Sequence, residues 1–472
     1  MINCDSLSRR INSRRGVWFA SVAAIAIATL GSAQAETIGG ALAKAYLSNP
    51  DINQQRAAVR ASDENIPKAN SGYLPTVSAE GDAAVSNTQA QGLSGVGGTT
   101  DATSHPRGYG LTVTENVWNG NRTLNSVRQA ESGVLGAREQ LRNTEQNVLL
   151  SAVTFYMDVL RDTAILELDR NNVEVLQEQL RQTQDRFNVG EVTRTDVAQA
   201  EASLAGARAT ALTAQSTLQA SVANYRQAIG EEPKSLAPVA PVVKPIPKTL
   251  ASAVAISQVE HPAIVAMLHG VDAAALQIKI TEGALYPTVG LTGNVSKRFD
   301  VAGYATGSQT LTGSVMAQVS IPIYEGGAVY AETRQAKEQL GQQELQTDLQ
   351  RDKVRAAVVA AWGANQNSLG ILRAAQAQVE AAEVALAGVR EEAKVGQRTT
   401  LDVLNAQQTL LNARVQLVTA QHDQVVNSYN LLSAVGRLSI GTLGLAVAEY
   451  DPRVHFDQVK NKWIGLRTPD GK

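Results

Sequence analysis

A stretch of about 45 residues occurs twice in this chain, and this repetition limits what the chain can fold into. Residues 186–230 align with residues 392–436, so that a Val-Gly pair, a Thr, an Asp-Val pair and a closing Gly are identical in both copies. Two unrelated Ala-rich helices would not keep these residue types in register. The sequence therefore predicts an internal duplication.

Each copy of the stretch predicts a helix end, a tight turn and a second helix. Gly190 and Gly396 are the residues that tolerate left-handed backbone just past a helix. Asp196 and Asp402 follow, where a carboxylate stabilises the positive end of the returning helix. An ordinary soluble helical hairpin would show the same pattern, so this part leaves the class of protein open.

The returning helices carry a coiled-coil seam in the same frame in both copies. Apolar or small residues recur at intervals of three and then four, which is the spacing of such a seam. Large residues alternate with Ala, and this lets the two helix backbones approach closely. The seam consists of Val197, Ala200, Leu204, Ala207, Ala211, Ala214, Leu218, Ser221, Tyr225 and Ala228, and of Val403, Ala406, Leu410, Ala413, Leu417, Ala420, Gln424, Asn427, Leu431 and Ala434.

The first 35 residues have the pattern of a signal peptide. A basic region with four arginines precedes an apolar region, Val17–Leu30, and a small-x-small cleavage site follows at Ala33-Gln34-Ala35. We therefore expect the mature chain to begin near Glu36, beyond the inner membrane of a bacterium. Cleavage would remove Cys4, the single cysteine of the chain, so no disulfide is expected in the mature protein.

The hydrophobic period changes to two in each repeat, over about 74–118 and 287–324. Val289, Leu291 and Val295 alternate with small polar residues, and the first copy shows the same alternation more weakly. Strands of about ten residues with one apolar and one polar face are typical of membrane β-barrels. A soluble, half-buried sheet is the alternative.

Four such strands in one chain are too few to close a barrel. Open sheet edges are not tolerated in hydrocarbon, so membrane strands would require several chains to share one barrel. Two chains would give a barrel filled by side chains, whereas three would give one wide enough for a lumen. The strands themselves do not decide between these numbers.

Each strand pair is followed by a very long helix, at about 123–188 and 329–395. At 1.5 Å per residue each would reach roughly 100 Å, about twice the length of the returning helix. The helices before the strands, about 37–72 and 251–285, have the missing length, and we expect them to stack end to end on the returning helices.

These elements predict five segments. The five prolines between the repeats predict that residues 231–250 form an extended connector at mid-height of the helices. The tail, 437–472, loses the helical pattern, and we expect it to lie over the same mid-height belt as the connector or to be disordered. The segments are the signal peptide 1–35, the first repeat 36–230 with its turn at 189–195, the connector 231–250, the second repeat 251–436 with its turn at 396–401, and the tail 437–472.

The composition and the motifs indicate neither catalysis nor a nucleic-acid partner. The formal net charge is only −2, and the five histidines show no metal-ligand spacing. No phosphate-binding loop and no Gly-x-Ser-x-Gly motif is present. We therefore expect no enzyme activity, no cofactor and no metal.

Three motifs together carry a resemblance to a known family. They are the doubled Val-Gly-x-x-Thr-x-x-Asp-Val turn, the Tyr-Leu-Pro and Leu-Tyr-Pro sequences before the strand pairs, and the aromatic-x-Gly sequences after them. In these motifs nearly all of the mature chain resembles the TolC family of outer-membrane efflux and type I secretion channels. The resemblance implies an α+β membrane protein: a homotrimer whose twelve-stranded outer-membrane β-barrel continues into a twelve-helix periplasmic α-barrel of coiled-coil hairpins.

The resemblance also implies a closed periplasmic entrance at the turns. Arg398 matches the family's basic gating residue, and Thr195 and Asp196 match the partners that it holds. Ala393 stands where family prototypes have a tyrosine, so one gate link is missing. In the alternative interpretation Asp196 is only a helix cap and Arg398 is a solvated charge.

Two further sites follow from the same resemblance. Asp402 matches an acidic ring at the entrance, whereas Asn405 replaces the second acidic position, which puts tight cation binding in doubt. Gly190 and Gly396 match the places where hairpins of a periplasmic adaptor protein dock.

The expected function is that of a passive exit duct in the outer membrane with a long periplasmic part. An adaptor and an inner-membrane pump of RND or ABC type would open it, for efflux or for type I secretion. The alternative is a non-conducting periplasmic coiled-coil protein that spaces the cell envelope. A self-contained porin is disfavoured, because four strands leave most residues outside a barrel.

Overall fold

The computed structural model describes residues 35–90, 100–242, 246–301 and 307–471. The expected signal peptide lies outside the described residues except for Ala35, and Glu36–Lys472 form one structural unit. In the described residues the helices are α1 (Ile38–Ser48), α2 (Pro50–Asp63), α3 (Asn65–Asn70), α4 (Arg122–Asn188), α5 (Arg194–Ile229), α6 (Leu250–Glu260), α7 (Pro262–Glu282), α8 (Ala328–Lys394), α9 (Thr400–Ala434), α10 (Ile440–Leu443) and α11 (Pro452–Val459), with 3-10 turns η1 (Ser71–Tyr73) and η2 (Gly283–Leu285). The strands are β1 (Thr76–Ala83), β2 (Ser86–Ala90), β3 (Thr100–Ser104), β4 (Arg107–Trp118), β5 (Thr288–Phe299) and β6 (Gln309–Ser320).

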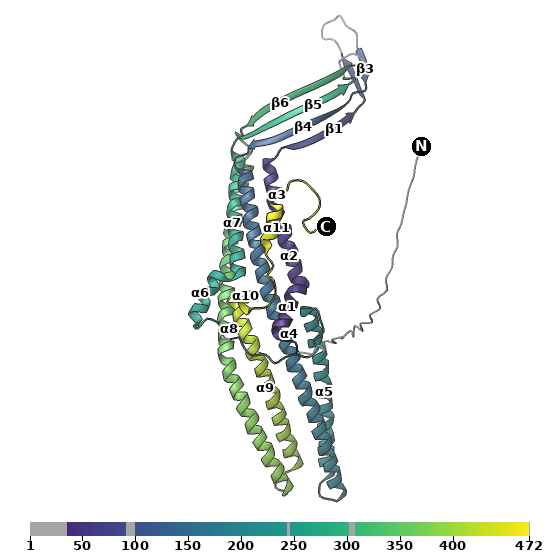
Figure 1. Ribbon diagram of the computed structural model, residues 1–472, viewed down its shortest axis with the longest axis vertical. Coiled ribbons are helices and arrows are strands. Elements are labelled where there is room, and N and C mark those ends of the chain that lie inside the picture. Colours follow the sequence, from purple (N-terminus) through teal and green to yellow (C-terminus); the bar gives the residue numbers. More distant parts are fainter. Residues whose placement is uncertain (1–34, 91–99, 243–245, 302–306, 472) are drawn as a thin grey trace, which may run out of the picture. The chain divides into compact units, whose positions relative to one another are not determined.

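The strand pairs of the two halves form one antiparallel sheet in the order β1-β4-β5-β6 (Figure 1). β4 and β5, which come from different halves, pair along nearly their whole length. A separate two-stranded sheet of β2 and β3 lies in the connection between β1 and β4. In the described residues, the outer edges of β1 and β6 have no strand beside them.

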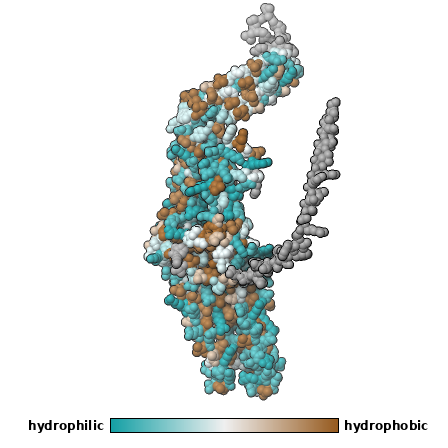
Figure 2. Space-filling model, viewed as in Figure 1, coloured by the Kyte–Doolittle hydropathy of each residue, from teal (hydrophilic) through white to brown (hydrophobic). Residues whose placement is uncertain are grey.

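One face of the four-stranded sheet is apolar and exposed. Val77 pairs with Val113, and Leu111 pairs with Val295, so these side chains lie on the same face. They are exposed, as are Leu311 and Val315 on β6, and Figure 2 shows hydrophobic residues along the strands. The opposite face carries mainly Thr, Ser, Asn and Gln. A soluble, half-buried sheet requires cover over its apolar face, and no described helix packs there.

The two long helices, α4 and α8, are 67 residues each, and each leads from a strand pair to a turn. α5 and α9 return along them, and α9 also packs on α4 (Figure 1). The remaining length of α4 is covered by α2, α3 and α7, and that of α8 by α6 and α7. Each long helix is therefore covered partly by its returning helix and partly by the helices that precede the strands.

The helices before the strands are not continuous, in contrast to our expectation for about 37–72 and 251–285. A new helix begins at Pro50 and at Pro262, where the ring removes a backbone donor and suits only the first helical turn. The preceding residues cap the new helices: Asp51 N–H donates to the side chain of Asn49 (2.8 Å), and Ala263 N–H donates to Nδ1 of His261 (3.2 Å). Because both cap residues are extended, the chain changes direction there.

The largest apolar core lies where α1, α2, α4, α5 and α9 meet. Tyr156 on α4 is fully buried, and its hydroxyl lies 2.6 Å from the carbonyl oxygen of Glu36 and 2.8 Å from that of Ala237. Tyr225 on α5 donates to the Glu36 carboxylate at 3.0 Å. These bonds attach the start of the unit and the connector 231–250, of which 243–245 are outside the described residues, to the core.

The tail, which we expected to lie over the belt of the connector or to be disordered, contains α10 and α11, and α11 packs on α2. Asp63 on α2 is fully buried and lies 3.0 Å from Nδ1 of His455 on α11 and 3.7 Å from Nη2 of Arg138 on α4. The backbone N–H of Tyr450 donates to the hydroxyl of Tyr46 at 3.1 Å. The tail therefore covers a buried ionic contact between α2 and α4.

Replacement of Asp63 by Ala should destabilise the unit strongly, by about 3–5 kcal/mol, because it leaves the Arg138 charge in a buried site without its carboxylate. Glu64→Ala is the matched control, since Glu64 is the exposed neighbour on the same turn. Thermal unfolding in detergent measures the difference. Equal melting temperatures for the two variants would show that the buried contact does not stabilise the fold.

Candidate functional site

The two turns at the ends of the long helices have the same backbone. Gly190 and Gly396 adopt φ angles of 80° and 79°. In each turn the glycine N–H bonds to the carbonyl three residues earlier, and the following N–H bonds to the carbonyl five residues earlier. No heavy atom lies within 4 Å of the position that a Cβ would take at either glycine. The backbone conformation, and not close packing, is therefore what requires glycine.

Both returning helices begin with a reciprocal cap. Thr193 N–H donates to Asp196 Oδ2 at 2.8 Å, and Asp196 N–H donates back to the Thr193 hydroxyl at 3.3 Å. Thr399 and Asp402 repeat this arrangement at 2.9 and 3.2 Å. The hydroxyl and N–H of Thr193 lower the pKa of Asp196, and the N–H and hydroxyl of Thr399 lower that of Asp402. Both carboxylates are therefore charged helix caps at neutral pH.

Arg398 pairs within its own hairpin. Its Nε donates to Glu392 Oε2 at 2.8 Å, so that within the chain it pairs with Glu392 and not with Thr195 or Asp196. The partner, Glu392, was not among the residues that the sequence indicated. Its position in the repeat is a signal that would have found it, because it aligns with Arg186.

The first hairpin has the same kind of ion pair with its charges exchanged. Arg186 at the end of α4 donates to Glu191 in the turn at 3.0 Å, whereas in the second hairpin Glu392 is on the helix and Arg398 is in the turn. All four side chains are about half exposed. The two turns therefore have the same backbone conformation, but the positions of the positive and negative side chains are reversed.

Near the turns the two hairpins touch through a small apolar cluster. Leu404 of α9 packs with Leu176 of α4 and with Leu204 and Ala207 of α5. A groove of 340 Å³ lies beside this cluster between α4, α5 and α9, and Asn405 is in its wall. A second groove, of 830 Å³, lies between α4 and α8 and is lined by charges of both signs.

The structure brings some of the predicted residues together and leaves others apart. Asp402 lies in the cap of α9, Asn405 is exposed one turn further along, and the two glycines are at the open ends of the turns. Among the residues that the structure describes, no group of three or more His, Cys, Asp or Glu side chains is arranged to hold a metal ion. The site therefore consists of two solvent-facing turns with fixed carboxylates and two grooves between the hairpins.

Comparison with known proteins covers most of the chain. A family model described as "Outer membrane efflux protein" matches residues 41–231 and 255–437. The outer membrane efflux protein BepC of Brucella suis is 42% identical over 441 residues, which cover 93% of this chain and 94% of BepC. The alkaline protease secretion protein AprF of Pseudomonas aeruginosa is 26% identical over 332 residues, which cover 68% of each chain.

Solved structures with the same fold include two outer-membrane proteins. The CmeC outer membrane channel of Campylobacter jejuni superposes with a TM-score of 0.77 at 16% identity, covering 90% of this chain and 89% of CmeC. The outer membrane protein VceC of Vibrio cholerae superposes with a TM-score of 0.73 at 18% identity, covering 84% of this chain and 96% of VceC. The helices and the sheet described above thus follow an outer-membrane channel fold.

Gly396→Ala should destabilise the turn by about 1–2 kcal/mol, because a Cβ is strained in left-handed backbone. Gly388→Ala is the matched control: this exposed glycine is inside α8, nothing lies near its Cβ position, and alanine should stabilise the helix by about 0.5–1 kcal/mol. Amide hydrogen exchange over the last turns of α8 reports both effects. If Gly396→Ala left exchange unchanged, the turn would not depend on its left-handed residue.

Proposed function

The chain belongs to the outer membrane efflux protein family, and we propose that it forms the passive exit duct of a tripartite efflux pump or of a type I secretion system. As a member of this family it is a channel of the outer membrane with a periplasmic extension, and it is not an enzyme. In this duct several chains build one barrel, the turns close the periplasmic end, and partner proteins open it.

The four-stranded sheet is the observation that supports assembly of several chains into one barrel. Four strands with an exposed apolar face and two unpaired edges are stable in lipid only when copies of the chain pair β1 of one with β6 of the next. Three copies give twelve strands and a lumen, whereas two give a barrel filled by side chains. A duct needs the lumen, so we favour the homotrimer.

The helices would continue this barrel into the periplasm. The two repeats, 36–230 and 251–436, each contribute one long helix and one return, so three copies give twelve helices around the axis. The connector 231–250 and the tail 437–472 lie outside the two repeats. Stretches of 67 residues make each helical arm about 100 Å long, enough to extend far from the membrane.

We propose that the turns form the closed periplasmic entrance. In the ring, Arg398 of one chain would exchange its partner within the hairpin, Glu392, for Thr195 and Asp196 of the next chain. Three copies of Asp402 would make a negative ring at the entrance, and with Asn405 as the second position the ring would bind cations only weakly. The charged, capped state of both carboxylates supports this arrangement.

The turns and the grooves between the hairpins are also the surfaces where partner proteins would bind. We propose that a periplasmic adaptor protein docks its helical hairpins at Gly190 and Gly396, where no side chain blocks the turns, and in the two grooves, one between α4 and α8 and the other between α4, α5 and α9. An inner-membrane pump of RND or ABC type would supply the energy and choose the cargo. Efflux and protein secretion appear among the names of the relatives, BepC and AprF.

Counting the chains in the purified oligomer tests this assembly. Native mass spectrometry of the detergent-solubilised, processed protein should give three chains per particle, since the unpaired edges of β1 and β6 have to meet. A stable single chain would contradict the proposal and favour the alternative, a non-conducting periplasmic coiled-coil protein.

Arg398→Ser should raise the single-channel conductance in planar bilayers, because it removes the proposed link across the entrance. Lys394→Ser is the matched control: it removes a cation from the last turn of α8 whose partner, Glu391, is on the same helix. If both variants conducted like the unaltered protein, Arg398 would have no part in the gate.

A further inference from the structure

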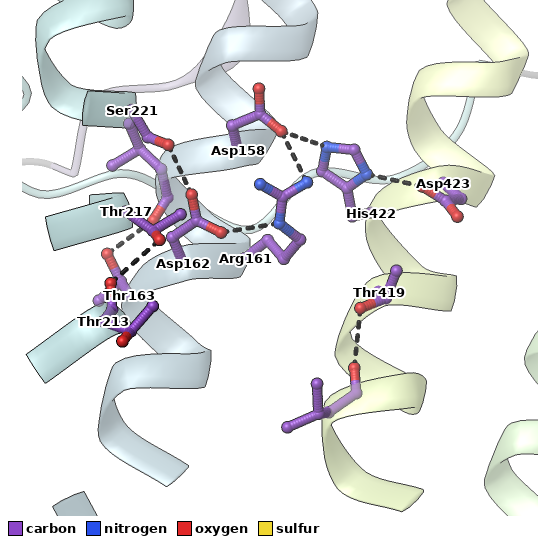
Figure 3. A network of polar contacts seen from close by, with 12 residues as sticks. Asp158, Arg161, Asp162, Thr163, Thr213, Thr217, Ser221, Thr419, His422 and Asp423 are labelled. Atoms are coloured by element: carbon purple, nitrogen blue, oxygen red, sulfur yellow. Dashed lines mark hydrogen bonds and ion pairs between the residues drawn. The ribbon is translucent and has the colours of Figure 1, made fainter. Parts of the chain in front are cut away.

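A buried polar network lies where the second hairpin crosses the first (Figure 3). His422 on α9 is 7% exposed, and both of its ring nitrogens face carboxylates. Nε2 lies 2.9 Å from Asp158 Oδ1 on α4, and Nδ1 lies 2.9 Å from Asp423 Oδ1 on α9 itself. A histidine in this position joins the two hairpins through one polar contact.

The network continues through α4 to α5. Nη1 of Arg161 lies 2.9 Å from Asp158 Oδ1, and its Nε donates to Asp162 Oδ1 at 2.7 Å. Ser221 on α5 donates to Asp162 Oδ2 at 2.5 Å. Three helices from both hairpins are therefore connected by one chain of charged groups that ends in the neutral hydroxyl of Ser221.

The network lies at a boundary along α9. Beyond His422 toward the C-terminal end, Val425, Tyr429 and Leu432 are buried in the core with α4. Toward the turn, α9 meets the first hairpin through the small cluster around Leu404. His422 thus marks the point where the contact between the hairpins changes from extensive to slight.

The protonation state of His422 decides how many of its bonds can form. Only the imidazolium donates from both nitrogens, whereas the neutral ring donates from one and directs a lone pair at the other carboxylate. The half-buried carboxylate of Asp158 and the buried carboxylate of Asp162 are balanced by His422 and Arg161 when the ring is charged. Loss of the proton leaves these two carboxylates with a single guanidinium.

We propose that His422 is a proton-dependent lock that fixes α9 to α4 and thereby sets where the second hairpin begins to move against the first. The effect on opening rests on the proposed gating function, but the lock itself does not. The groups that face the ring are Asp158 and Arg161 from α4 and Asp423 from α9, and α5 contributes the neutral Ser221 behind Asp162.

The direction of the pH dependence follows from these contacts. Burial lowers the pKa of His422, but the bonds to Asp158 and Asp423 outweigh it, so that the pKa is raised above its usual value. A group with a raised pKa stabilises the folded contact fully below its unfolded pKa of about 6.5. The stabilisation is lost as the pH rises through the raised pKa, so the lock opens on the alkaline side.

Hydrogen exchange of α9 in the purified protein, measured between about pH 6 and pH 9, tests the lock. The rates are corrected for the intrinsic pH dependence of exchange. In the unaltered protein, protection of the amides around His422 should fall by about tenfold across one protonation step, the effect of losing a charge-assisted bond. A flat profile would overturn the proposal, and this measurement needs no variant.

Two substitutions of His422 test the contributions of its two ring nitrogens separately. His422→Gln places an amide donor where Nε2 faces Asp158, so protection should be independent of pH and equal to that of the deprotonated protein. His422→Asn places the donor where Nδ1 faces Asp423 on the same helix, so protection should be lower at every pH. Equal behaviour of the two variants would show that the contact to α4 does not act as the lock.

His269→Gln is the matched control. His269 also has a carboxylate neighbour, Asp272 at 3.8 Å, but both residues lie on α7. This variant should follow the unaltered protein, and loss of its pH dependence would assign the effect to His269. Conductance is measured separately, so a conducting channel with flat exchange removes the lock alone, and pH-dependent exchange without conductance removes the proposed function alone.

Discussion

Backbone hydrogen bonding at the edges of the sheet is the constraint on which the rest of this structure depends. β1 and β6 each leave a row of N–H and C=O groups without a partner strand in the described residues, beside a face of exposed apolar side chains. Water satisfies such an edge but repels such a face, whereas lipid accepts the face and not the edge. In the proposed assembly, copies of the chain pair these edges with one another and expose the apolar face to lipid, and the number of copies would then fix how many long helices surround the common axis.

The helical part is stabilised by two contact surfaces on α9, of which the sequence revealed one. The predicted seam contains Leu410, Ala413 and Leu431, and these residues are buried toward α8. A second set, which includes His422, Val425 and Leu432, is buried against α4, while Gln424 of the predicted seam is only half-buried. Periodicity identifies the partner within a hairpin, but the helix that lies across it comes from the other repeat and leaves no local signal.

The turns, the strands and the long helices could be placed from local chemistry, because glycine, the Thr-Asp caps and the change of period act within a few residues. The breaks at Pro50 and Pro262 had an equally local signal, which the expectation of continuous helices passed over. The packing of the tail on α2 had no local signal in the sequence, because it depends on a contact between His455 and Asp63, which are almost 400 residues apart. The gate partners of Arg398 stay a prediction, because the proposed contact joins two chains.

The exchange of charges between the turns has a consequence for recognition. Arg186 and Glu191 in one turn, and Glu392 and Arg398 in the other, form electric dipoles that point in opposite directions on the same backbone shape. In the proposed ring, six turns of like form would alternate in polarity. A protein that meets this ring through shape alone encounters six equivalent positions, whereas one that carries charges encounters three of each kind. Electrostatics, and not backbone geometry, would then set the register in which a partner binds.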